Sequence, residues 1–60
     1  MLRSAFYKAI ADSFAVVNYH GLHISLFFSD WLSMYINGRL RYIGYSYADI
    51  VKTIDLELNV

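Results

Sequence analysis

The stretch "MYINGRLRYIGYSYADIVKTI", Met34–Ile54, decides the expected fold because it has the spacing of a β-hairpin that runs into a helix. Its Asn37-Gly38 pair is typical of a two-residue hairpin turn, since both residues adopt positive φ angles readily. The flanking segments, 31–36 and 39–45, are rich in aromatic and branched side chains, which favour strands. We therefore expect these two segments to pair as antiparallel strands.

A short helix is the competing interpretation of the residues before the Asn-Gly pair. Ser29 or Asp30 could cap its N-terminus, and Asn37 and Gly38 could end it, because both tolerate the left-handed conformation of a helix C-terminus. The hairpin is favoured because "RLRYIGY", 39–45, has strand chemistry and needs a neighbouring strand.

The register of this hairpin determines which side chains share a face. A two-residue turn pairs Ile36 with Arg39 and puts the apolar residues of the first strand on the same face as both arginines. A bulged turn pairs Tyr35 with Arg39 and separates the faces, so we favour it. The buried face would then hold Leu32, Met34, Leu40 and Tyr42. The other face would hold Trp31, Tyr35, Arg39, Arg41 and Ile43.

A helix is expected after the hairpin. Ser46, followed three residues later by Asp49, is a capping signal. Apolar residues then recur at helical spacing: Tyr47, Ile50, Val51, Ile54 and Leu58. The alternative is a helix that stops near Thr53, followed by a short terminal strand, because the last apolar residues also alternate with polar ones.

A helix and a strand are expected before the hairpin. Apolar residues at a spacing of four predict a helix over Ser4–Ala15, although Val16 and Val17 blur its end because β-branched residues favour strands. Residues 18–21 supply a turn, and alternation predicts a strand over Leu22–Phe28.

The expected fold is therefore α+β, with an N-terminal helix, a three-stranded antiparallel sheet that includes the Asn-Gly hairpin, and a C-terminal helix. Both helices should cover one face of the sheet. No proline, linker or repeat divides the chain, so residues 1–60 should form a single compact domain. The expected core comprises Phe6, Ile10, Phe14, Leu22, Ile24, Leu26, Leu40, Ile50, Val51 and Ile54.

The composition is unusually apolar for so short a chain. Hydrophobic residues make up 58% of the 60 residues and charged residues 17%, which is more apolar surface than a small monomer readily hides. We therefore expect a homo-oligomer or burial against another protein. The longest uncharged run, Ser13–Ser29, is broken by Asn18 and two histidines, so neither a membrane span nor a signal peptide is predicted and the cytoplasm is the expected location.

No catalytic, cofactor or metal signature stands out. His20 and His23 with Asp30 are metal-ligating residue types, but around a turn the two rings need not converge and no further ligand is nearby, so they are better explained as turn and surface residues. Cysteine is absent, and no nucleophile elbow or glycine-rich phosphate loop occurs. We expect a protein that is not an enzyme and that has no catalytic, cofactor-binding or metal-binding residues.

Two binding functions compete for the tyrosines and arginines of the hairpin. Single-stranded nucleic acid could stack on the tyrosines and pair with Arg39 and Arg41, but the net charge of zero argues against phosphate binding. The same residue types are enriched at protein interfaces. We therefore favour an interaction module, a regulator or inhibitor of phage or mobile-element type, that occludes a larger partner protein. The predicted partner-binding residues are Trp31, Tyr35, Arg39, Arg41 and Tyr45.

Overall fold

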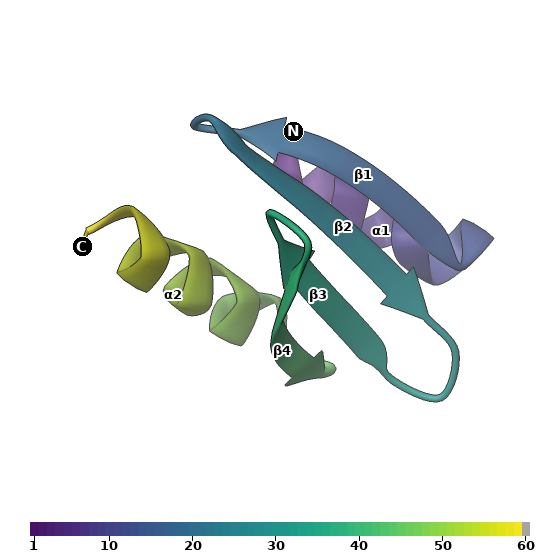
Figure 1. Cartoon of the computed structure of the whole chain (residues 1–60). Coiled ribbons are helices and arrows are strands. Elements are labelled where there is room, and N and C mark those ends of the chain that lie inside the picture. Colours follow the sequence, from purple (N-terminus) through teal and green to yellow (C-terminus); the bar gives the residue numbers. More distant parts are fainter. Residues whose placement is uncertain (60) are drawn as a thin grey trace.

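The computed structural model, which describes residues 1–59, contains two helices and a four-stranded antiparallel sheet (Figure 1). The elements are α1 (Leu2–Asp12), β1 (Phe14–Tyr19), β2 (Leu22–Phe28), β3 (Leu32–Ile36), β4 (Arg39–Gly44) and α2 (Tyr47–Leu58). The strands lie in the order β1-β2-β3-β4, so each pairs with its neighbour in the sequence. The α+β class is confirmed.

Tight turns join the strands of the two hairpins β1–β2 and β3–β4. Asn37 and Gly38 have φ angles of 51° and 84°, and His20 and Gly21 have 50° and 82°. Positive φ at both central residues is what a type I′ turn requires, and this turn matches the twist of the flanking strands. The predicted Asn-Gly hairpin is confirmed, and the alternative helix before it is wrong.

The N-terminal helix is shorter than predicted, and a fourth strand follows it. α1 ends at Asp12, and Ser13 adopts a left-handed conformation (φ 76°) that turns the chain back along the sheet. The backbone N–H of Phe28 donates to the Ser13 carbonyl at 2.9 Å, which fixes this reversal. The β-branched Val16 and Val17 therefore lie in β1, and the three-stranded sheet is corrected to four strands.

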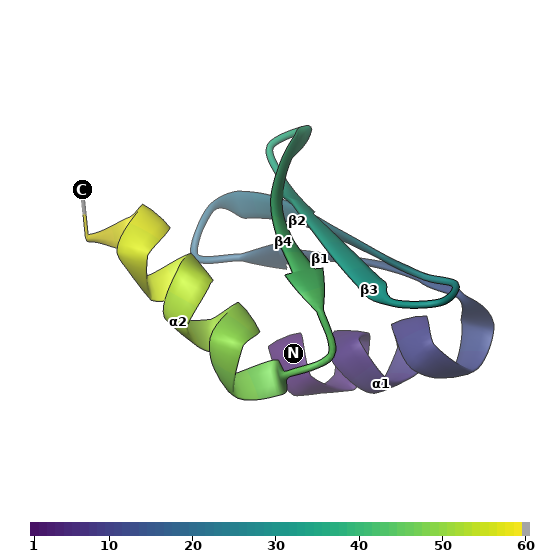
Figure 2. The same ribbon diagram turned by 90° about the horizontal axis from the view of Figure 1, so that it is seen from below.

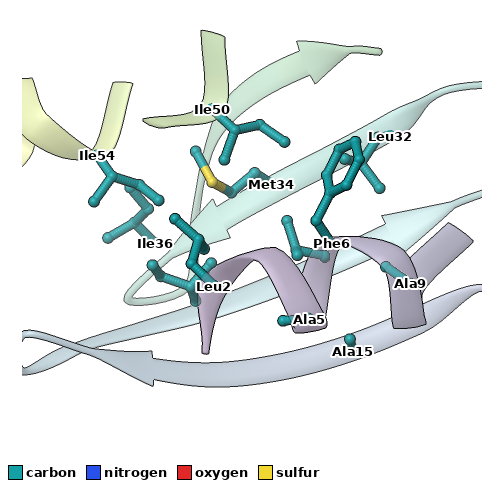
Figure 3. Close-up of a cluster of buried hydrophobic side chains, with 12 residues drawn as sticks. Leu2, Ala5, Phe6, Ala9, Ala15, Leu32, Met34, Ile36, Ile50 and Ile54 are labelled. Atoms are coloured by element: carbon teal, nitrogen blue, oxygen red, sulfur yellow. The ribbon is translucent and has the colours of Figure 1, made fainter. Parts of the chain in front are cut away.

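Both helices lie on one side of the sheet, as predicted (Figure 2). α1 packs against β1 and β2, and α2 packs against β4. Phe6 of α1, Met34 of β3 and Ile50 of α2 belong to one cluster of buried side chains, so the two helices share one core (Figure 3). The buried side chains are Leu2, Ala5, Phe6, Ala9, Ala15, Ile24, Leu26, Leu32, Met34, Ile36, Ile50 and Ile54.

Three residues of the predicted core are exposed. Phe14 is in a strand and alternates with the buried Ala15, so its side chain points away from the helices. Ile10 is exposed because α1 turns its small residues, Ala5 and Ala9, to the sheet. Leu40 is exposed because of the hairpin register described below. Of the other predicted core residues, Phe6, Ile24, Leu26, Ile50 and Ile54 are buried, and Leu22 and Val51 are partly buried.

α2 begins at the predicted cap and continues to Leu58. The backbone N–H of Asp49 donates to the Ser46 hydroxyl at 3.2 Å, which satisfies one free donor of the first turn. The alternative terminal strand is wrong for residues 54–58, and Val60 lies outside the described residues. Neither helix within residues 1–59 is long and apolar enough to cross a membrane.

Candidate protein-interaction surface

One face of the sheet points away from both helices, and we call it the open face. Strand alternation places it opposite the buried Ala15, Leu26 and Met34. Two rows of its residues run across all four strands, and Asn18 and His23 continue the face on β1 and β2. The first row is Phe14, Phe27, Ser33 and Ile43. The second row is Val16, Ser25, Tyr35 and Leu40.

The open face is apolar and exposed. Five of the eight residues in the two rows are large hydrophobics that are each 45–52% exposed: Phe14, Val16, Phe27, Leu40 and Ile43. The centroids of the Phe14 and Phe27 rings lie 4.9 Å apart. The Phe27 and Tyr35 rings pack edge to face, with their centroids 5.6 Å apart. These contacts restrict the rings before any partner arrives, which lowers the entropy that binding would cost.

No charged side chain belongs to the open face. The five basic and five acidic residues of the chain all lie elsewhere. They are on α1 (Arg3, Lys8, Asp12), in the β2–β3 loop (Asp30), on β4 (Arg39, Arg41) and on α2 (Asp49, Lys52, Asp55, Glu57). A partner could therefore dehydrate the open face without burying a charge, which is the costly step in forming many interfaces.

The exposure of these side chains does not reflect a loosely folded chain. The total accessible surface is 3932 Å² for a mass of 7.0 kDa. Folded monomers of that mass expose about 4,000 Å², so the chain is as compact as its size predicts. The apolar excess of the composition is thus present on the surface, and the open face carries much of it.

A β-bulge in β4 decides which hairpin residues reach the open face. The two-residue turn pairs Ile36 with Arg39, and the ladder then pairs Tyr35 with Leu40 and Met34 with Tyr42. Arg41 is therefore an extra residue without a partner on β3. The predicted bulged turn, which pairs Tyr35 with Arg39, is wrong: the turn has two residues, and the bulge lies farther along β4.

The displaced bulge corrects three of the predicted face assignments, those of Arg39, Leu40 and Arg41. Leu32, Met34 and Tyr42 lie on the helix side as expected, whereas Leu40 lies on the open face beside Tyr35. Arg39 shares the helix side with its partner Ile36.

The predicted partner-binding residues are thus divided between the two sides. Tyr35 is on the open face, while Arg39 and Arg41 are not, and the Arg41 guanidinium lies 3.5 Å from the Glu57 carboxylate on α2. Trp31 is half-exposed in the β2–β3 loop. The hydroxyl of Tyr45 donates to the Asp30 carbonyl of the same loop at 2.6 Å.

Sequence reasoning missed the first strand's share of the surface. The four-residue spacing predicts a helix through Phe14 with an ill-defined end at Val16, and this pattern gives no sign that both side chains lie on a face of the sheet. The position of Phe27 could have indicated the open face. Phe27 alternates with the buried residues of its strand and shares a face with His23 and Ser25, which are polar and expected toward solvent. A phenylalanine at such a position indicates an apolar outer face.

Residues 1–59 contain neither a pocket nor a group of three or more His, Asp or Glu residues placed to hold a metal ion. The His20 ring packs edge to face against Tyr19 at 4.4 Å, and the backbone N–H of His23 donates to the Asn37 side-chain oxygen at 3.0 Å. No protein-family model, curated protein or solved structure matches the chain. The open face is therefore the feature from which a function can be inferred.

Proposed function

We propose that this protein is a non-enzymatic interaction module whose open face binds a larger protein. It would act as a regulator or inhibitor, of phage or mobile-element type, by occluding the surface that it covers. The observation that supports this proposal is the uncharged open face with five half-exposed large hydrophobics side by side. Contiguous apolar patches on small proteins commonly mark interaction sites.

The anchors of the interface would be aromatic. Phe27 and Tyr35 stand in the middle of the face on the two central strands, where a partner would exclude water most completely. Large aromatic side chains at the centre of an interface supply most of its binding energy. Leu40 and Ile43 would fill the β4 side of the same footprint.

The footprint would extend beyond the two rows. A standard interface buries about 800 Å² per partner, roughly one fifth of this chain's surface. Four strands spaced at about 4.8 Å make the rows only roughly 15–20 Å long, so neighbouring side chains must contribute. Trp31 and Tyr45 are the exposed aromatic residues at the end of the sheet nearest the first row. We include both in the proposed interface.

Binding of single-stranded nucleic acid is the alternative, and the geometry favours it less. It requires tyrosines and arginines on one surface, but Tyr35 faces the open side while Tyr42 faces the helices. Arg41 is paired with Glu57, and Arg39 points to the side opposite Tyr35. A stacking platform with a basic rim is therefore absent from the hairpin in the part of the chain that the structure describes.

Affinity capture from an extract of the native host, with the partner identified by mass spectrometry, tests the proposal. Trp31→Ala and Tyr35→Ala should each weaken capture of that partner by at least about 2 kcal/mol, or roughly 30-fold. Tyr7→Ala is the control, because Tyr7 is an exposed aromatic on α1, away from the open face. If the control loses the partner and the Trp31 and Tyr35 variants both keep it, the interface is on the helices and the proposal fails.

A titration of a fluorescent single-stranded oligonucleotide at low salt separates the two functions. Protein binding alone predicts no signal at tens of micromolar. A signal that disappears in Arg39→Ala/Arg41→Ala and weakens steeply with salt would instead support the nucleic-acid function.

A further inference from the structure

The two edge strands of the sheet differ in how they are protected. β4 carries a bulge and two arginines, both of which hinder pairing with another strand. β1 reads Phe-Ala-Val-Val-Asn-Tyr, without charge or proline, and it pairs with β2 in unbroken register over all six residues. β1 lies at the margin of the sheet (Figure 1). It is therefore the edge at which another strand can be added.

The hydrogen-bond pattern identifies the free groups of this edge. The N–H of Phe28 donates to the Ser13 carbonyl, so Ser13 and Phe28 form a hydrogen-bonded pair. Such pairs alternate along an antiparallel ladder, so alternate β1 residues, beginning with Ala15, bond to β2. Phe14, Val16 and Asn18 then direct their N–H and C=O groups outward. The edge offers three donors and three acceptors in a straight line.

We propose that β1 pairs with β1 of a second copy of this chain, antiparallel, about a two-fold axis at Val16. Only outward-facing residues can form hydrogen-bonded pairs across the new junction. With the axis at Val16, that residue faces Val16 of the second copy, and Phe14 faces Asn18 of the second copy. All three outward residues are then used, which gives about six backbone hydrogen bonds. Moving the register by two residues leaves about four.

A second copy suits this edge better than an unrelated strand for two reasons. The edge is self-complementary in the register above, which is the requirement of a two-fold interface. The strand also has no charged residue and the chain has no net charge, so two copies do not repel each other. The dimer would carry one eight-stranded sheet whose two open faces are continuous.

The size of the junction predicts a weak dimer. Interfaces carry about one hydrogen bond per 100–200 Å², so about six bonds correspond to about 600–1,200 Å² in total. This lies at the low end for specific association, and we expect dissociation in the micromolar range. The proposal does not depend on the proposed function, because it uses the strand edge and not the partner-binding face.

Sedimentation over a range from about 1 µM to 1 mM tests this inference. The parent should shift from 7.0 kDa to twice that mass. Val16→Pro removes an outward N–H that bonds to no residue of β2, so the fold should persist while the dissociation constant rises at least about tenfold. Val16→Lys brings two positive charges together at the axis and should also raise the dissociation constant. It replaces the proline variant if that variant does not fold. Ile43→Lys is the control on the opposite edge strand and should dimerise like the parent.

Hydrogen exchange gives an independent measurement. The amides of Phe14, Val16 and Asn18 should exchange more slowly as concentration rises, because only the dimer protects them. A monomer at all concentrations would overturn the inference. So would a dimer that is lost in Ile43→Lys and kept in Val16→Pro, since that dimer would form through the open face and not through the backbone of β1.

Discussion

The Arg41 guanidinium lies 3.5 Å from the Glu57 carboxylate, which links the bulge of β4 to the C-terminal half of α2. Arg41 can reach α2 because it is the extra residue of the bulge, between Leu40, which pairs with Tyr35, and Tyr42, which pairs with Met34. The β3–β4 pairs before Arg41 and the pairs after it are each in regular register, and only Arg41 interrupts the ladder. One unpaired residue therefore accounts for the irregularity of the hairpin.

Deletion of Arg41 should leave the fold intact. The remaining β4 residues already pair in order with β3, so closing the gap restores a regular ladder and keeps Tyr42 on the helix side. The lost ion pair is about one third exposed, so its loss should cost less than about 1 kcal/mol. Urea unfolding and amide chemical shifts would measure both effects.

Deletion of Tyr42 is the matched control, because it shortens the same strand by one residue. Arg41 would then take the place of Tyr42 opposite Met34, so a guanidinium would replace a ring that packs against the core, and the Ser46 N–H would lose its acceptor. That placement should cost several kcal/mol and leave the chain largely unfolded. An equal loss of unfolding free energy in the two deletion variants would contradict the bulge assignment.

The hairpin and the last helix could be predicted from sequence because local chemistry decides them. Asn37 and Gly38 suit a turn with positive φ at both positions, and Ser46 with Asp49 suits a helix start. In both cases the favoured conformation depends on neighbours in the sequence. Tertiary packing did not need to override the local preference.

The first strand could not be predicted because two patterns overlap there. Phe14 continues the four-residue spacing of α1, while Val16 and Val17 favour a strand. Ser13 resolves the conflict by taking a left-handed conformation, which is unusual for serine. Pairing with β2 stabilises the strand, and that interaction between two segments is not visible in the spacing of either one.

The candidate site was predicted only in part, because it depends on the position of a single bulge. Tyr35 could be placed correctly, as its face follows from either register. Leu40 and Arg39 exchange faces when the bulge moves from the turn to Arg41. With the bulge at Arg41, the guanidinium lies beside Glu57 of α2, a contact between distant segments that the hairpin sequence does not encode.

Two nearby apolar residues of α2, Ile54 and Leu56, differ in how deeply their side chains are buried. Ile54 is fully buried, so Ile54→Ala should cost about 2–5 kcal/mol and unfold much of a domain this small. Leu56 is 66% exposed, so Leu56→Ala should change stability by less than about 0.5 kcal/mol. Thermal unfolding followed by circular dichroism compares the two directly. Similar losses would mean that α2 packs through a different face.

The N-terminal cap of α2 should be worth about 1 kcal/mol. Ser46→Ala removes the acceptor for the Asp49 N–H, and an exposed first turn offers only water in its place. Ser46→Asp retains an acceptor at the same position and should restore most of the loss. Guanidinium unfolding of the three proteins checks this order. A parent-like alanine variant would show that the cap does not hold the helix.

Gly44 should be intolerant of a side chain because the Tyr42 ring covers it. A Cβ at this position would lie 2.7 Å from the Tyr42 Cζ and would clash with its Oη. The ring cannot move freely, since the Ser46 N–H donates to that Oη at 3.0 Å. Gly44→Ala should therefore cost about 1–3 kcal/mol.

A double-mutant cycle shows whether the Tyr42 hydroxyl is the cause of that cost. Tyr42→Phe alone should cost about 1 kcal/mol, because the Ser46 N–H loses its acceptor. In the Tyr42→Phe background, Gly44→Ala should cost at least about 0.5 kcal/mol less than in the parent, because the nearest clashing atom is gone. Chemical denaturation of the four proteins gives the coupling energy. Strictly additive effects would mean that the backbone around Gly44, and not the tyrosine, resists the substitution.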